Sequence, residues 1–147
     1  MPLLGPVDGA ALAAMAAWIA AIPLEDWPQQ HRLADGQIRP AMVTDLAWRG
    51  FAAMAEPITR EFTAGRLTWH ALSCIMPGHS IPAHRDEQPI DWLYRAHVPL
   101  LTNPRATFNG EHFAAGFAYA VDTTEPHEVR NDGASPRIHF MFDVGAR

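Results

Sequence analysis

The sequence contains no lysine and only one cysteine, and both scarcities exclude classes of protein. Its 11 basic residues are all arginine and are outnumbered by 16 acidic residues, which gives a formal net charge of -5. A nucleic-acid-binding surface needs an excess of basic residues, so this class is excluded. Because Cys74 has no second cysteine to pair with, no internal disulfide can form. We therefore expect a reducing, cytoplasmic compartment.

Long hydrophobic runs are also lacking. The most apolar stretch, residues 8–22, is rich in alanine and is shorter than the roughly 20 residues that cross a bilayer. No lysine or arginine precedes Arg32, so this stretch does not have the basic start of a signal peptide. Asp8 as an N-cap and Pro23 as a stop predict a helix instead, and we expect no membrane association.

The length and composition fit one domain spanning residues 1–147. Hydrophobic residues make up 48% of the chain, enough for a folded core. We expect a helical buttress over 1–65 and a β core over 66–147. After the first helix, residues 24–39 form a connector rich in proline and glutamine. A second helix is predicted over 44–64, opened by Thr44 or Asp45 and kinked or divided at Pro57.

From Arg66 onward the pattern changes to short extended runs separated by turns. The runs are expected at residues 67–76, 80–86, 94–101, 117–121, 128–131 and 137–144. Asn109-Gly110, flanked by Ala106-Thr-Phe and Glu111-His-Phe, predicts a two-residue hairpin. Seven or eight strands at this spacing indicate a mainly β fold, a double-stranded β-helix (jelly roll, cupin-like) barrel with helices packed outside.

The stretch from Ser73 to Asp86 carries the strongest chemical signal. Two extended runs meet at the turn Pro77-Gly78, and the second ends in His84-Arg-Asp86. Side chains alternate along a strand, so His84 and Asp86 project from one face and can bind one metal ion. His127, far downstream, supplies a third ligand. Two histidines and one carboxylate with open positions are typical of non-haem Fe(II) oxygenases.

A late alternating strand adds a cation to this set. Arg137, His139, Met141 and Asp143 are expected on one face of residues 137–144. The fork-shaped guanidinium of Arg137 suits a dicarboxylate.

These motifs, between Ser73 and Asp143, resemble the aspartyl/asparaginyl β-hydroxylase family of Fe(II)/2-oxoglutarate-dependent oxygenases, including its bacterial proline-hydroxylase relatives. Arg95-Ala-His97-Val-Pro-Leu is similar to the family's Arg-x-His-x-Pro-Leu strand, and His127-Glu-Val-Arg-Asn131 to its His-x-Val-x-Asn segment. Arg137 stands ten residues beyond the distal ligand, as in the family. Animal aspartyl hydroxylases lack the carboxylate ligand, so Asp86 places the resemblance closer to the bacterial branch.

The resemblance implies a cofactor, a cosubstrate and a reaction. Fe(II) would be held by His84, Asp86 and His127. Arg137 would bind the far carboxylate of 2-oxoglutarate, assisted by Ser73. Arg95 and His97 would lie at the metal-chelating end of the cosubstrate. With O2 the enzyme would hydroxylate an unactivated C–H of an amino acid, a peptidyl Asp, Asn or Pro or a related small molecule, releasing succinate and CO2. No catalytic residue beyond the metal ligands is implied.

Substrate contacts are expected in residues 87–94, which read as a loop that begins and ends beside the metal. Trp92, Tyr94 and Arg85 are the predicted substrate residues. Two other functions fit parts of the pattern. A cupin-like metalloenzyme without 2-oxoglutarate would keep the metal ligands but have no need of Arg137, and a non-catalytic ligand-binding barrel would tolerate loss of a metal ligand. The sequence leaves the substrate and the oligomeric state open.

Overall fold

A computed structural model describes residues 3–32, 38–62 and 66–146. Along the chain the elements are β1 (Leu3–Pro6), α1 (Gly9–Ala20), η1 (Leu24–Asp26), β2 (Gln29–Arg32), β3 (Ile38–Val43), η2 (Trp48–Gly50), α2 (Phe51–Thr59), η3 (Arg60–Phe62), β4 (Arg66–Ile75), β5 (Ser80–His84), β6 (Trp92–Leu101), β7 (Ala106–Phe108), β8 (Phe117–Val121), β9 (His127–Asn131) and β10 (Arg137–Gly145). The mainly β fold is as predicted, and the strands from β4 onward lie within two residues of their predicted bounds.

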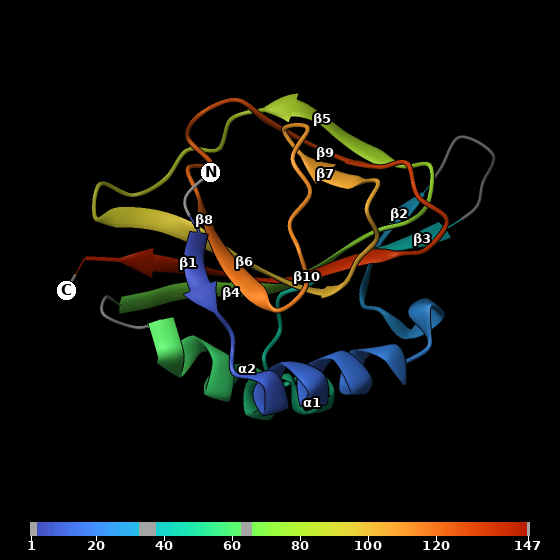
Figure 1. Cartoon of the computed structure of the whole chain (residues 1–147), viewed down its shortest axis with the longest axis horizontal. Coiled ribbons are helices and arrows are strands. Elements are labelled where there is room, and N and C mark those ends of the chain that lie inside the picture. The colour runs from blue at the N-terminus through green and yellow to red at the C-terminus, as the bar shows by residue number, and fades with distance from the viewer. Residues whose placement is uncertain (1–2, 33–37, 63–65, 147) are drawn as a thin grey trace.

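The strands of the described residues form two facing sheets. The large sheet has the order β1-β8-β6-β10-β4-β3-β2, and the small sheet has the order β5-β9-β7. The small sheet lies on one side of the large sheet, and α1 and α2 lie on the other (Figure 1). The arrangement is jelly-roll-like, but the two sheets are not joined into a closed barrel within these ranges.

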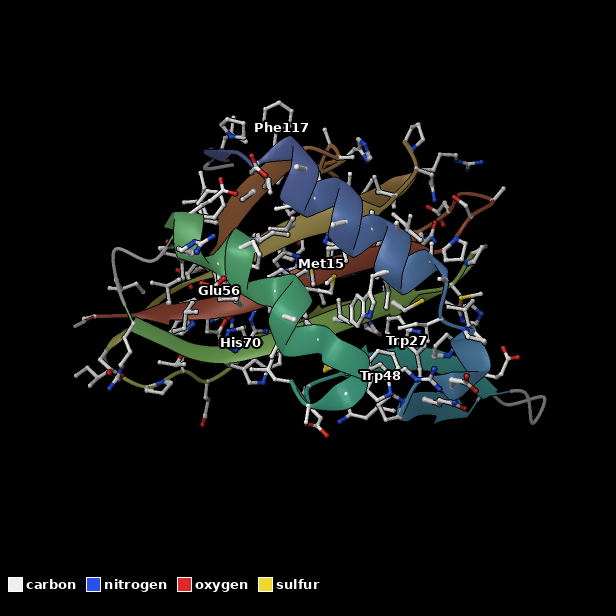
Figure 2. All side chains as sticks on the ribbon, turned by 90° about the horizontal axis from the view of Figure 1, so that it is seen from below. Met15, Trp27, Trp48, Glu56, His70 and Phe117 are labelled. Atoms are coloured by element: carbon white, nitrogen blue, oxygen red, sulfur yellow. The ribbon has the colours of Figure 1, made fainter. Side chains whose placement is uncertain are left out.

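Alternation along β10 separates the apolar core from the polar face of the large sheet. Phe140 and Phe142 point toward the helices and are fully buried, together with Met15 and Ile19 of α1 and Phe51 of α2. Figure 2 shows the two helices lying across this face. The odd-numbered positions of β10 therefore face the small sheet.

The first helix begins as predicted and the second begins later. The Asp8 carboxylate accepts a hydrogen bond from the Ala11 N–H at 2.9 Å, which caps α1. In the second region, Arg49 and Gly50 have φ of +48° and +79°, so a continuous helix from residue 44 is not possible. The helix starts at Phe51, and Pro57 lies inside it without dividing it. The last residues of this prediction, 63 and 64, lie outside the described ranges.

The predicted connector contains helical and strand residues that the sequence pattern did not predict. The region holds η1, β2 and the start of β3, although Pro28 and Pro40 argue against strands there. β2 is an edge strand, and Met42 of β3 pairs with Ser73 of β4. The described part of residues 1–65 therefore extends the large sheet as well as covering it. Residues 33–37 of the predicted connector are outside the described ranges.

No helix among the described residues is both long enough and apolar enough to span a membrane. The longest of those described as α-helix, α1, has 12 residues.

The turn between β9 and β10 is fixed by one buried side chain. The Asn131 amide donates to the Ile75 carbonyl at 2.8 Å and to the Ser135 carbonyl at 2.9 Å. Its oxygen accepts from the Gly133 N–H at 3.1 Å and from the Asn103 amide at 3.1 Å. Because β10 starts directly after this turn, the network sets the position of Arg137.

We expect Gly133→Ala to destabilise the fold by about 1–3 kcal/mol, the usual cost of overpacking. An added Cβ would lie 2.0 Å from the Asn103 side-chain oxygen, and Asn103 cannot move freely because its amide donates to Asn131 and to Ser135. Urea unfolding measures the effect. Gly9→Ala is the matched control, since nothing lies within 4 Å of its added Cβ. Equal midpoints for Gly133→Ala and the parent would contradict this account of the turn.

Candidate functional site

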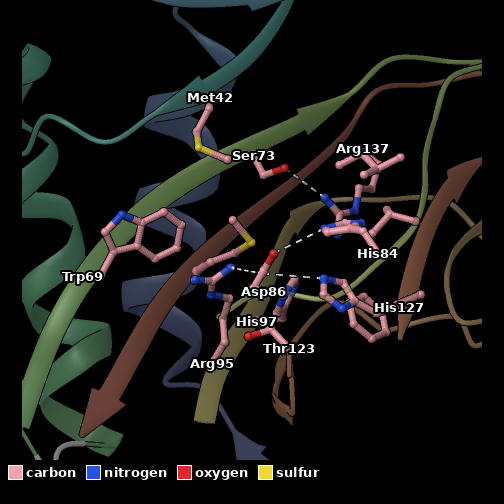
Figure 3. Close-up of a pocket in the computed structure, with 14 residues that line it drawn as sticks. Met42, Trp69, Ser73, His84, Asp86, Arg95, His97, Thr123, His127 and Arg137 are labelled. Carbon is pink, nitrogen blue, oxygen red and sulfur yellow. Dashed lines mark hydrogen bonds and ion pairs between the residues drawn. The ribbon is translucent and has the colours of Figure 1, made fainter. Parts of the chain in front are cut away.

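Three side chains with metal-ligating atoms converge between the two sheets. His84 of β5 lies opposite His127 of β9 in the strand register, with ring centroids 4.2 Å apart. Asp86 lies 3.6 Å from the His84 Nε2 and 3.7 Å from the His127 Nε2, measured to its two carboxylate oxygens. All three ligand atoms fall within 4.8 Å of one another. Figure 3 shows them directed toward one point.

Both histidines present the same ring nitrogen to that point. The Nδ1 of His84 lies 2.8 Å from the Pro82 carbonyl, and the Nδ1 of His127 lies 2.9 Å from the Glu125 carbonyl. A carbonyl oxygen only accepts, so each Nδ1 carries a proton, and in the neutral imidazole the Nε2 lone pair faces Asp86. This second hydrogen bond orients metal-binding histidines in proteins. Lone pairs and a carboxylate facing one another at 3.6–3.7 Å call for a cation between them.

Asp86 reaches the cluster from a loop. β5 ends at His84, so the strand does not extend to residue 86 as predicted. The backbone N–H of Asp86 donates to the Thr123 carbonyl at 2.8 Å, which holds the loop beside the small sheet. The expected proximity of His84 and Asp86 is nevertheless present.

A buried arginine faces the same cavity. Arg137 is 2% exposed, and its Nη1 donates to the Ser73 hydroxyl at 3.3 Å. None of the ion pairs among the described residues includes it. Burial lowers the pKa of its guanidinium to about 9, so it remains a cation at neutral pH. One cavity of about 240 Å³ is lined by Arg137, Ser73 and the three ligating residues.

Two more histidines form a buried pair next to this cavity. The Nδ1 atoms of His97 and His139 lie 3.0 Å apart, so one ring donates and the other accepts. Burial, with the charge of Arg137 adding to it, holds the pKa of both imidazoles well below the ordinary value. Both rings are therefore neutral at pH 7. His97 also lines the cavity.

Arg95 is engaged with two carboxylates. Its Nε and Nη2 donate to Asp143 at 2.7 and 3.0 Å, and its Nη1 lies 3.5 Å from Asp86. The guanidinium also stacks over the Trp69 ring at 4.2 Å. The resemblance led us to expect Arg95 at the cosubstrate, whereas here its donors are directed to protein carboxylates.

Comparison with known families identifies the chain. The family described as aspartyl/asparaginyl β-hydroxylase matches residues 50–146, well over half of the chain and all of the site described above. The chain belongs to the aspartyl/asparaginyl β-hydroxylase family. Among curated proteins, none matches it by sequence.

Solved structures show the same fold as this hydroxylase-family chain. AviO1 from Streptomyces viridochromogenes Tue57 superposes with a TM-score of 0.74 at 15% identity, over 97% of this chain and 88% of AviO1. An oxidoreductase of the 2OG-Fe(II) oxygenase family from Burkholderia pseudomallei gives 0.64 at 17% identity, over 95% of this chain and 83% of that one. At these identities the likeness concerns the fold.

The predicted substrate residues of this hydroxylase-family chain are not brought together. Arg85 lines an opening beside Asp86. The predicted loop 87–94 ends earlier than expected, because β6 already begins at Trp92. Tyr94 packs with the core beneath the helices, and neither Trp92 nor Tyr94 lines this opening or the central cavity.

Trp69 and Asp143 take places that sequence reasoning did not give them. Trp69 lines both the cavity and the opening, and Asp143 holds Arg95. Alternation along β4 puts Trp69 on the same face as Ser73, and this pattern would have predicted the position of Trp69 in the cavity wall. Asp143 was predicted on the Arg137 face, but pairing with Arg95 depends on the β6–β10 register, which the sequence does not show.

The buried histidine pair predicts a loss of stability in acid. Each imidazole binds a proton more readily in the unfolded chain than in the fold, so stability is full above about pH 6.5 and falls below it. As the pH falls below 6.5, each histidine should lower the free energy of unfolding by about 1.4 kcal/mol per pH unit until its folded pKa is reached. Urea unfolding at pH 7.5, 6.5 and 5.5 measures this slope. The variant His97→Gln/His139→Gln should give a flatter slope below pH 6.5, and an unchanged slope would rule the pair out as its source.

Proposed function

We propose that this chain is an Fe(II)- and 2-oxoglutarate-dependent dioxygenase. It would hydroxylate an unactivated C–H of an amino acid, a peptidyl Asp, Asn or Pro or a related small molecule, and release succinate and CO2. Its membership of the aspartyl/asparaginyl β-hydroxylase family supports a hydroxylase.

The observation that carries the proposal is a buried cation without an anion, Arg137, in the same cavity as three clustered metal-ligating side chains. An uncompensated buried guanidinium is costly, and a bound carboxylate would remove that cost. Likewise the Nε2 atoms of His84 and His127 and the Asp86 carboxylate need a cation. Fe(II) and a dicarboxylate together satisfy both requirements, so the residues present fit both groups.

Each residue then has a defined task. His84, Asp86 and His127 would hold Fe(II) and leave coordination positions free for the cosubstrate. Arg137, steadied by the Ser73 hydroxyl, would bind the far carboxylate of 2-oxoglutarate through a bidentate pair. His97, neutral and buried, would form the wall near the metal-chelating end. When bound, Fe(II) and 2-oxoglutarate supply the oxidising chemistry by activating O2.

The primary substrate would approach through the opening beside Asp86. This opening has a volume of about 550 Å³ and shares Trp69, Asp86 and Arg95 with the central cavity. Arg85 and Trp69 on its wall offer a cation and an aromatic surface, in place of the predicted Trp92 and Tyr94. A molecule seated there would lie next to the metal ligands without displacing the cosubstrate from Arg137.

The strongest alternative is a cupin-like metalloenzyme that does not consume 2-oxoglutarate. Such an enzyme would use the same three ligands but leave Arg137 without a partner. A non-catalytic ligand-binding barrel is disfavoured because both histidines are oriented toward Asp86 by their own hydrogen bonds.

A succinate-release assay distinguishes these possibilities. The protein, loaded with Fe(II) and given 2-oxoglutarate and ascorbate, is screened against free amino acids, short peptides containing Asp, Asn or Pro, and small acids. We expect O2-dependent succinate that rises with at least one of them and is lost in His127→Ala. A protein that binds Fe(II) but leaves 2-oxoglutarate unconsumed throughout would support the cupin-like alternative.

A further inference from the structure

Three side chains form a row across the centre of the large sheet, on the face toward the small sheet. Asp143 of β10 is paired in register with Arg95 of β6 on one side and with Trp69 of β4 on the other. These are three adjacent strands in the middle of the sheet. Of the strand pairings in the described residues, β10–β4 and β10–β6 are the longest, so the row lies where strand pairing is most extensive.

Asp143 and Trp69 fix the guanidinium of Arg95 on two sides. Asp143 binds its Nε and Nη2 with a bidentate pair at 2.7 and 3.0 Å, and Trp69 covers its plane at 4.2 Å from the ring centroid. The side chains of Asp143 and Arg95 are 6% and 15% exposed, so solvent screens this pair little. One edge of the guanidinium, at Nη1, is left pointing at Asp86, 3.5 Å away.

Asp86 is the metal-ligand candidate with the least support of its own. His84 and His127 belong to paired strands and are oriented through Nδ1. Asp86 follows the end of β5, its side chain is 31% exposed, and its backbone is held by the N–H that reaches Thr123. Its side-chain contacts outside the two histidines come from Arg95. Arg95 is therefore placed to orient this carboxylate.

We propose that Asp143 is a positioning residue for the metal centre and acts through Arg95, which it holds against Asp86. Asp143 also offsets a positive charge that would otherwise lie beside the cation site and weaken metal binding. Arg95 is then part of the metal-binding apparatus, and its donors are not free to serve as the carboxylate anchor that Arg137 provides. The inference rests on the proposed function, because it takes the cluster at Asp86 to bind Fe(II).

Metal titration tests this inference without catalysis. Affinity for Mn(II) and the visible absorption of the Co(II)-loaded protein are measured in the absence of 2-oxoglutarate for the parent, Asp143→Asn, Arg95→Gln and the double variant. Asp26→Asn is the matched control, because it breaks an exposed ion pair with Arg49 at 3.1 Å outside the cavity. His84→Ala reports whether the metal site itself is correctly assigned.

We expect Asp143→Asn to weaken Mn(II) binding by about 10–100-fold, the usual effect of removing an outer support of a metal ligand. The Co(II) absorption should change as well, because Asp86 binds differently. Arg95→Gln should weaken Mn(II) binding by about tenfold or more, and adding Asp143→Asn to it should cost less than about twofold further. Asp143→Glu should restore part of the affinity, and Asp26→Asn should bind like the parent.

Several results would overturn the inference. An Asp143→Asn variant with parental Mn(II) affinity and Co(II) absorption would show that Asp86 needs no such support. If Asp143→Asn reduces Mn(II) affinity as much in the Arg95→Gln variant as in the parent, Asp143 does not act through Arg95. If Asp143→Asn alone does not fold, the double variant, which removes both charges, is compared with Arg95→Gln and the parent. Parental Mn(II) affinity in both Arg95→Gln and the double variant would again overturn the inference. If His84→Ala also binds like the parent, the proposed metal site is what has failed.

Discussion

His84→Ala, Asp86→Ala and His127→Ala are each expected to weaken Mn(II) or Co(II) binding by more than about 100-fold and to abolish succinate release. Removing a ligand should cost more than removing its outer support, for which about 10–100-fold is usual. Since the three ligand atoms lie within 4.8 Å of one another, no one of them can be spared without opening the cluster on one side. Isothermal titration with Mn(II) gives the affinities directly.

His79→Ala is the control for these three variants. His79 lies in the turn before β5, outside the cavity, and its loss should leave metal binding at the parental level. Parental affinity in all three ligand variants would show that the metal, if any, binds elsewhere. A loss confined to one histidine would point to a different ligand set.

Replacing Arg137 should separate cosubstrate binding from metal binding. Arg137→Lys keeps a positive charge but loses the planar fork, so the Kd for 2-oxoglutarate should rise about 100-fold, equivalent to about 3 kcal/mol of charge-assisted hydrogen bonding. Mn(II) affinity should stay at the parental level, because Arg137 donates to Ser73 and is not among the ion-pair partners of Asp86 in the described residues. Arg130→Lys, at an exposed arginine of β9, is the matched control.

The burial of Arg137 also predicts how its replacement changes the stability of the protein. Arg137→Met replaces an unpaired buried cation by an apolar side chain, so the protein without 2-oxoglutarate should be at least as stable as the parent. Added 2-oxoglutarate should then raise the Tm of the metal-loaded parent but not that of the variant. A normal 2-oxoglutarate affinity in both Arg137 variants would end the assignment of this residue as the carboxylate anchor.

Much of the fold was predictable because its signals are local. Helix α1 has its cap at Asp8, and β10 alternates Phe140 and Phe142, which face the core, with His139 and Asp143 on the opposite face. Asn109 and Gly110, with φ of +48° and +79°, form the predicted tight turn, although β7 then pairs with β9. Such patterns are set by neighbours along the chain.

The parts that could not be predicted depend on partners far away in the sequence. β2 has no apolar residue and β3 contains Pro40, so neither has a clear strand pattern. Their place in the large sheet follows from the pairing of β3 with β4 and of β2 with β3. At the site, the predicted metal and cosubstrate residues line one cavity between the two sheets, and alternation along each strand was enough to predict which side chains point into it. The engagement of Arg95 by Asp143 follows from a pairing across 48 residues, which no periodicity reveals.

Anaerobic titration of the Fe(II)-loaded protein with 2-oxoglutarate tests the central claim most directly, because chelation of the metal by the proposed cosubstrate would give a visible charge-transfer absorption before any reaction occurs. We expect this absorption to saturate at one 2-oxoglutarate per chain, to require a far higher concentration in Arg137→Lys, and to be absent in His127→Ala. If the Fe(II)-loaded parent shows no such absorption and no binding of 2-oxoglutarate by calorimetry, the chain does not use this cosubstrate.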